Sequence, residues 1–178
     1  MTSAPTLETP RLLLRAHRAE DFDALFALWT HPDVARYISP TQDRAEAWRK
    51  LLMKPGMWAL MGFGYWAVED QATGRLIGDV GFHDMRRELE PSLDGTMEAG
   101  WSFAPDAQGR GFALEAMEAV IGWRSKTHPH LPVTCIVDEE NGRSLKLAAR
   151  LGFRETARTI YKEKPILVLA LETATPNG

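Results

Sequence analysis

Hydrophobic spacing predicts an amphipathic helix near the start of the chain. Between residues 20 and 29, large apolar side chains recur at positions i, i+3, i+4 and i+7, as on one face of an α-helix: Phe22, Leu25, Phe26 and Trp29. The pattern breaks at His31-Pro32, because proline cannot continue a helix. We therefore expect the helix to end there.

A second helix is predicted to begin at Ser39-Pro40-Thr41-Gln42. Serine at the N-cap, proline at the first helical position and glutamine at the third are signals of a helix start. The spacing places Ala45, Trp48 and Leu52 on the buried face of this helix.

Alternating and β-branched segments predict seven strands. Turn residues at 70–74 suggest that two of these strands form an antiparallel hairpin. Residues 85–96 are charged and rich in turn formers, so they are expected to form a loop. The predicted strands are 11–15, 64–69, 75–83, 97–104, 133–137, 153–162 and 166–171.

Two further helices complete the pattern, one from Gly111 to Trp123 and one from Arg143 to Leu151, with Gly152 as the residue after its end. About four helices and about seven strands in this order indicate a mixed α/β (α+β) layer fold. We expect one domain over residues 6–172, with flexible termini at 1–5 and 173–178.

Composition excludes several classes of protein. The chain has 178 residues, 44% of them hydrophobic, which matches an ordinary globular domain. A net charge of −3 does not favour a nucleic-acid or anionic-membrane binder. No signal-peptide core and no membrane span are recognised, so a cytoplasmic location is expected. The lone Cys135 lies in an apolar strand and is expected to be buried and inert.

The segment Gln108-Gly109-Arg110-Gly111-Phe112-Ala113 lies between a predicted strand and a predicted helix. Glycines there would let a backbone approach a ligand, and amides at a helix N-terminus suit phosphate. A Walker loop fails because no lysine or hydroxyl residue follows Gly111, and a dinucleotide fingerprint has Leu114 where its third glycine should be. A glycine turn without a ligand remains open.

Five segments together resemble the GNAT acetyltransferase superfamily. Besides the glycine segment they are Asn141-Gly142-Arg143-Ser144 and Leu151-Gly152-Phe153; the opening Glu8 to Arg15 and the turn His31-Pro32-Asp33-Val34 are similar to the ribosomal-protein (RimJ/RimL-like) branch. The resemblance spans about Thr6 to Leu171.

In this family the glycine segment holds the pyrophosphate of acetyl-CoA, and the strand at 98–104 splays from that at 133–137 to pair with the pantetheine arm. Asn141 matches an asparagine that bonds this arm, with a helix cap as the alternative. The residues that the resemblance assigns to acetyl-CoA are Trp101, Ser102, Phe103, Gln108, Gly109, Arg110, Gly111, Phe112, Ala113, Asn141 and Ser144.

The resemblance implies direct transfer of the acetyl group to a primary amine in a ternary complex. Such an amine must lose a proton, and Glu98 is the candidate base, with a solvent-facing strand-edge carboxylate as the alternative. Many relatives have a tyrosine where this chain has Ala148. Ser144, Tyr161 or water must then protonate the thiolate, although Ser144 has a helix cap as its alternative role.

The amine itself is not identified by the sequence, because acceptor specificity in such folds lies in variable loops, here 39–64 and 83–97. A protein N-terminus and a small-molecule amine both fit. The same fold would also suit a catalytically weak CoA-binding or interaction module. No metal site, nucleic acid or membrane is expected, and the resemblance allows a homodimer.

Overall fold

The computed structural model describes residues 3–38 and 43–172 of the chain. Two compact units are formed, the first by Met1–His83 with Gly100–Thr127 and the second by Asp84–Ala99 with His128–Gly178. Strand β5 (Met97–Phe103) runs through both, with three residues in the second unit and four in the first.

The first unit contains strands β1 (Leu7–Glu8), β2 (Leu12–Arg15), β3 (Tyr65–Asp70) and β4 (Arg75–His83), hydrogen-bonded in that order and antiparallel throughout. The C-terminal half of β5 follows β4, and the Ala104 N–H donates to the Ile77 carbonyl at its end. Its helices are α1 (Phe22–Thr30), α2 (Pro32–Ala35), α3 (Arg44–Met61) and α4 (Phe112–Thr127), with short 3-10 turns at Ala19–Asp21 and Pro105–Ala107.

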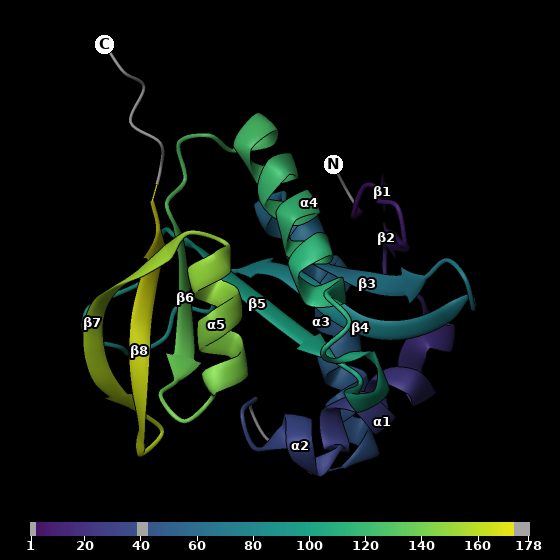
Figure 1. Cartoon of the computed structure of the whole chain (residues 1–178), viewed down its shortest axis with the longest axis horizontal. Helices are drawn as coiled ribbons and strands as arrows, with labels where there is room; N and C mark the ends of the chain where they lie inside the picture. The colour runs from purple at the N-terminus through teal and green to yellow at the C-terminus, as the bar shows by residue number, and fades with distance from the viewer. Residues whose placement is uncertain (1–2, 39–42, 173–178) are drawn as a thin grey trace. The chain divides into compact units, whose positions relative to one another are not determined.

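Helices α3 and α4 flank the β3–β4 hairpin of the first unit (Figure 1). Successive strand residues point to opposite faces of a sheet. Accordingly, the Tyr65 ring lies under the Lys54 ammonium of α3, while the Trp66 ring contacts Trp123 of α4. Both faces of this hairpin are therefore covered.

The buried face of α3 differs from the predicted one. Ala45 is exposed, and Trp48 and Leu52 are 38% and 56% exposed. The residues that α3 buries are Ala47, Leu51, Lys54, Met57 and Trp58. The prediction was wrong because the buried face includes Lys54. A search for apolar periodicity does not detect a charged residue that is buried because a distant residue neutralises it.

The start of α3 is capped by Asp43, whose carboxylate accepts the Glu46 N–H at 2.8 Å. The start signal predicted at 39–42 lies outside the described residues. At its other end α3 stops at Gly62, which has the left-handed conformation common after helices.

The second unit is built from β6 (Val133–Asp138), β7 (Phe153–Tyr161) and β8 (Lys164–Leu171), with helix α5 (Gly142–Arg150) against them (Figure 1). Strand β8 pairs antiparallel with both β6 and β7. The N-terminal part of β5 pairs parallel to β6 through Met97–Val133 and Glu98–Thr134. Asp84–Thr96 forms a loop, as predicted.

The mixed, mostly antiparallel α/β fold is confirmed. Within residues 3–38 and 43–172 the sheet has eight strands, in the order β1-β2-β3-β4-β5-β6-β8-β7, and there are five α-helices. Sequence patterns predicted seven strands and four helices, because β1 has two residues and α2 has four, too few for a period to show. Among the described helices, none is long and apolar enough to cross a membrane.

Candidate functional site

The glycine segment of the first unit turns sharply before α4. Gly109 and Gly111 have φ angles of +75° and +80°, in the left-handed region that side chains rarely adopt. The Glu115 N–H donates to the Gly111 carbonyl at 3.1 Å, which makes Gly111 the residue that caps α4. The next three amides, at residues 112–114, have no acceptor within the helix by its geometry. Amides so placed suit an anion.

This segment is anchored to the start of the chain by Arg11. The Arg11 guanidinium donates to the Arg110 carbonyl at 2.9 Å and to the Glu115 carboxylate at 2.6 Å. Thr9 and the Arg11 main chain also donate to Glu115. Burial alone would raise the pKa of Glu115, but these hydrogen bonds lower it. The carboxylate therefore stays ionised and holds Arg11 beside the glycine segment.

Two guanidinium groups meet the ring of Phe112, since Arg11 and Arg110 each lie 4.6 Å from its centroid. Phe112 itself is buried, whereas Gly109, Arg110 and Gly111 are exposed. The surface of the segment is thus backbone flanked by positive charge, which is the chemistry that phosphate requires.

Several side chains assigned to acetyl-CoA have structural partners in the first unit. Gln108 donates to the Phe103 carbonyl at 2.9 Å, and the Phe103 ring packs beside Gly78. Ser102 donates its hydroxyl to Asp79 at 2.5 Å. Trp101 is half-buried. Because the side chains of Ser102 and Gln108 are bonded within the protein, a ligand would contact the main chain of these two residues.

A buried ion pair joins α3 to β4 in this unit. The Lys54 ammonium donates to Asp79 at 2.7 Å, with side chains 5% and 3% exposed. Burial raises the pKa of Asp79, but the positive charge of Lys54 outweighs it and lowers the pKa to about 2. The nearby His17 has neither ring nitrogen hydrogen-bonded, and burial followed by the Lys54 charge lowers its pKa to about 4.

In the second unit, Asn141 caps α5. Its side-chain oxygen accepts the Ser144 N–H at 3.1 Å. Capping uses the oxygen, so a bond from Asn141 to a ligand would come from its amide nitrogen. Ser144 lies in the first turn of α5, and the N-cap residue is Asn141. Ala148 is fully buried.

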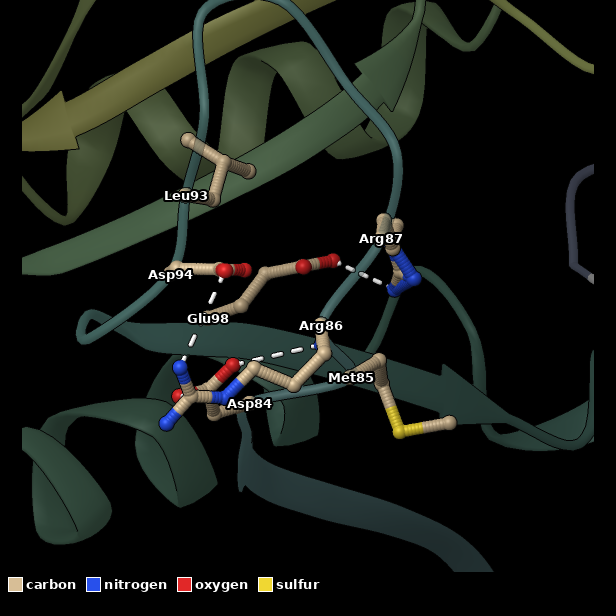
Figure 2. Close-up of a pocket in the computed structure, with 7 residues that line it drawn as sticks. All are labelled: Asp84, Met85, Arg86, Arg87, Leu93, Asp94 and Glu98. Carbon is tan, nitrogen blue, oxygen red and sulfur yellow. Dashed lines mark hydrogen bonds and ion pairs between the residues drawn. The ribbon is translucent and has the colours of Figure 1, made fainter.

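Glu98 on β5 is a buried carboxylate. Its side chain is 6% exposed and accepts from the Arg87 guanidinium at 2.7 Å (Figure 2). The alternative that Glu98 faces solvent at a strand edge is therefore wrong. Burial, with the negative charge of Glu98 as a second cause, raises the pKa of the neighbouring Cys135 thiol, as expected for an inert cysteine.

A small pocket opens beside Glu98, with a volume of about 10 Å³. This is about the space that a single water molecule occupies by the same measure. Figure 2 shows the side chains around it, from the loop after β4 and from β5: Asp84, Met85, Arg86, Arg87, Leu93, Asp94 and Glu98.

Tyr161 lies in the same cluster. Its ring centroid is 5.3 Å from the Arg87 guanidinium that pairs with Glu98. The sequence named Tyr161 as a candidate proton donor but did not predict which residues it contacts. In the second unit, Tyr161 is the last residue of β7 and contacts Arg87 of the Asp84–Thr96 loop. Glu98 and Tyr161 therefore both contact Arg87.

Comparison with known proteins identifies the fold family. Residues 11–154 match the model of the acetyltransferase (GNAT) domain. The chain belongs to the GNAT acetyltransferase family. One relative is the uncharacterized N-acetyltransferase p20 of Bacillus licheniformis. It is 30% identical over 153 residues, which are 84% of this chain and 83% of p20. The solved structure of a GNAT acetyltransferase from Bordetella pertussis is 32% identical, covers 95% of this chain and 100% of its own, and has a TM-score of 0.85.

More distant GNAT structures share the fold alone. One is described as a ribosomal-protein-S5-alanine acetyltransferase of Vibrio fischeri, with 18% identity, a TM-score of 0.76 and coverage of 94% of this chain and 96% of its own. Another is a spermidine N-acetyltransferase of Vibrio cholerae in complex with CoA and spermine, with 19% identity, a TM-score of 0.72 and coverage of 92% and 96%. The RimJ/RimL-like branch is thus suggested rather than shown.

The sequence did not predict the structural roles of three residues that surround the glycine segment and Glu98. Arg11 and Glu115 fix the glycine segment, and Arg87 pairs with Glu98. Arg11 and Glu115 are 104 residues apart, so no local pattern links them. The signal that was available for Arg87 was its position in a charged loop next to the strand of the candidate base.

Proposed function

We propose that this GNAT protein transfers the acetyl group of acetyl-CoA directly to a primary amine, with donor and acceptor bound together. The observation that carries the proposal is the glycine segment, which has left-handed glycines and flanking arginines within the region that matches the family. The family match supports acetyl transfer to amines. The fold neighbour with bound CoA supports the choice of donor.

On the donor side, the amides of Gln108 to Ala113 bind the pyrophosphate of acetyl-CoA. Left-handed turns at Gly109 and Gly111 aim successive amides outward, and the dipole of α4 favours negative charge at that end. Trp101 to Phe103 pair their main chain with the pantetheine arm. Asn141 adds a hydrogen bond through its amide group.

On the acceptor side, Glu98 acts as the base. An ammonium proton moves to the Glu98 carboxylate, directly or through one water in the adjoining pocket, and leaves a neutral amine. The amine nitrogen then attacks the thioester carbonyl, a C–N bond forms, and the C–S bond breaks. The departing thiolate takes up a proton from Tyr161, Ser144 or water, and the second proton lost by the attacking nitrogen replaces the one that this donor gave up. The products are an amide and CoA.

The acceptor is a primary amine, either at a protein N-terminus or on a small molecule. The fold neighbours include one named for a ribosomal-protein alanine and one for spermidine, so the fold accommodates both kinds of acceptor. We place the activity in one cytoplasmic domain spanning residues 6–172, with a homodimer as the expected assembly.

A pair of glycine variants tests the donor site. Gly109→Ala and Gly74→Ala both put a methyl group at a left-handed glycine where the space is open, with φ +75° and +68°. Both variants should lose about 1 kcal/mol of stability. Only Gly109→Ala should weaken CoA binding, by about 10-fold, when measured by calorimetry on the full chain.

The wild-type protein provides the matching positive test. CoA at 100 times its dissociation constant should raise the free energy of unfolding by about 2.7 kcal/mol. A panel of amines and N-terminal peptides should then show acetyl transfer from acetyl-CoA. The absence of stabilisation at millimolar CoA would refute the proposal, and CoA binding without transfer to any amine would favour a CoA-binding module instead.

A further inference from the structure

The loop Asp84–Thr96 presents two consecutive arginines in opposite ways. The Arg86 side chain is 71% exposed, whereas that of Arg87 is 16% exposed and points to Glu98 (Figure 2). A guanidinium is normally kept at the surface, because its removal from water costs several kcal/mol unless it is paired. The inward orientation of Arg87 therefore calls for a specific explanation.

Contacts within the loop produce this orientation. Arg86 has φ +47°, an uncommon value for a residue with a side chain, immediately before Arg87. The Asp84 carboxylate accepts the main-chain N–H groups of Arg86 and Gly95, at 3.3 and 3.2 Å, so both ends of the loop are tied to one residue. Thr96 then bonds Thr134 of β6 at 2.8 Å.

Several charged or titratable groups surround the Glu98 carboxylate in the second unit. Arg87 lies at 2.7 Å, and the Asp84 and Asp94 carboxylates and the Arg86 guanidinium line the same pocket. On β6, the buried Cys135 thiol stays protonated. The ring of Tyr161, on β7, faces Arg87. Arg87 is the cation in direct contact with Glu98, and the two other carboxylates of this pocket disfavour a further negative charge.

We propose that Arg87 is the positioning residue for the base of acetyl transfer, holding Glu98 ionised and correctly directed. This inference rests on the proposed function. A base works only in its ionised form, and a buried carboxylate without a cation beside it takes up a proton at higher pH. Arginine supplies a permanent charge, since it does not lose its proton in proteins.

The pairing also fixes geometry. The 2.7 Å contact joins Nη2 of Arg87 to Oε1 of Glu98, which fixes the orientation of the carboxylate group. The Tyr161 ring also holds the guanidinium through a cation–π contact at 5.3 Å. Arg87 itself need not touch either substrate.

The test compares three variants of the full chain. Arg87→Gln removes the charge, Arg87→Lys keeps it, and Arg158→Gln is the control. The control removes the same type of charge from an exposed arginine of the second unit that does not line the pocket beside Glu98. For each protein, kcat, KM for the amine, CoA affinity and the thermal midpoint are measured from pH 5 to pH 10.

Arg87→Gln should lower kcat at neutral pH by about 10-fold or more and move the acidic limb of the rate profile up by about one pH unit, with CoA affinity unchanged. Arg87→Lys should restore most of kcat and the original limb. Arg158→Gln should behave as the wild type. A purely structural role would lower the midpoint of Arg87→Gln and leave its pH profile in place, and this result would overturn the inference.

The outcome also separates the inference from the function on which it rests. If the wild type acetylates amines and Glu98→Gln does not, an unaltered pH profile in a folded Arg87→Gln variant refutes only the role of Arg87. If the wild type binds no CoA, the proposed function itself has failed. If Arg87→Gln does not fold, Arg87→Lys and the wild type still decide, since a shifted limb in the folded lysine variant contradicts a role based on charge.

Discussion

Each compact unit contains a buried ion pair, Lys54–Asp79 in the first and Arg87–Glu98 in the second, and these two pairs have different surroundings. In the first unit, Lys54 and Asp79 are 5% and 3% exposed, Ser102 bonds the second carboxylate oxygen, and the Tyr65 ring covers the ammonium at 3.5 Å. In the second unit, Glu98 adjoins a water-sized pocket, and Arg87 reaches it from a loop.

The comparison indicates that a buried ion pair can stabilise the fold or can take part in catalysis. Both oxygens of the Asp79 carboxylate are bound, by Lys54 and Ser102, and the pocket beside Lys54 is not lined by Asp79, so this carboxylate joins α3 to β4. Glu98 has a pocket beside it and a partner whose position depends on loop contacts. Variants of each pair should therefore change different properties, folding for Lys54–Asp79 and turnover for Arg87–Glu98.

The largest effect is expected at Asp79. Asp79→Asn leaves the Lys54 ammonium buried without its counter-charge, which should cost about 3–5 kcal/mol of unfolding free energy. Urea unfolding of the purified protein measures the change. As a control, Arg158→Ala removes an exposed ion pair with Glu155 and should not alter the midpoint measurably. A stable Asp79→Asn variant would show that the first pair contributes little to folding.

Glu98→Gln should act on rate rather than on folding. The amide keeps the size of the side chain but cannot take a proton, so kcat at neutral pH should fall by about 100-fold. CoA affinity, measured by calorimetry, should stay within about twofold of the wild type, because Glu98 is assigned no contact with CoA. Unchanged turnover would remove Glu98 from the mechanism and with it the contrast between the two pairs.

The smallest effect concerns His17, which lies beside the first pair. Because burial lowers its pKa from 6.5 to about 4, the unfolded chain binds a proton there before the folded chain does. Stability should therefore decrease as pH falls from 6.5 towards 4, by about 2 kcal/mol between pH 7 and pH 5.

His17→Gln cannot titrate, so this part of the pH dependence should disappear from its unfolding curves. An NMR titration of the His17 ring in the wild type gives the same quantity directly. If the His17 ring titrates near 6.5, burial beside the Lys54–Asp79 pair does not lower its pKa, and this prediction is wrong.

Local signals predicted much of the fold. The hairpin at 65–83, the turn at Gly109 and Gly111, and the end of α5 at Gly152 follow from residues within a few positions of one another. The face of α3 was mispredicted at Trp48 and Leu52, because Lys54 is buried through its bond to Asp79, 25 residues away. Apolar periodicity holds no information about that partner.

For the candidate site, the sequence identified the types of residue but not their partners. It selected Glu98 and the glycine segment, and the family match covers both. It did not show that Glu98 is buried or that Arg87 neutralises it. It also assigned Ser102 to acetyl-CoA, whereas the hydroxyl of Ser102 is bound to Asp79.

By itself, the sequence determined most of the strands and helices, the glycine segment before α4 and the family. These depend on backbone conformations and short-range periods that each segment has on its own. The tertiary structure alone decided which charges meet: Arg11 with Glu115, Lys54 with Asp79, and Arg87 with Glu98. The physical reason is that burial of a charge is tolerated only when folding delivers its partner, and that partner comes from elsewhere in the chain.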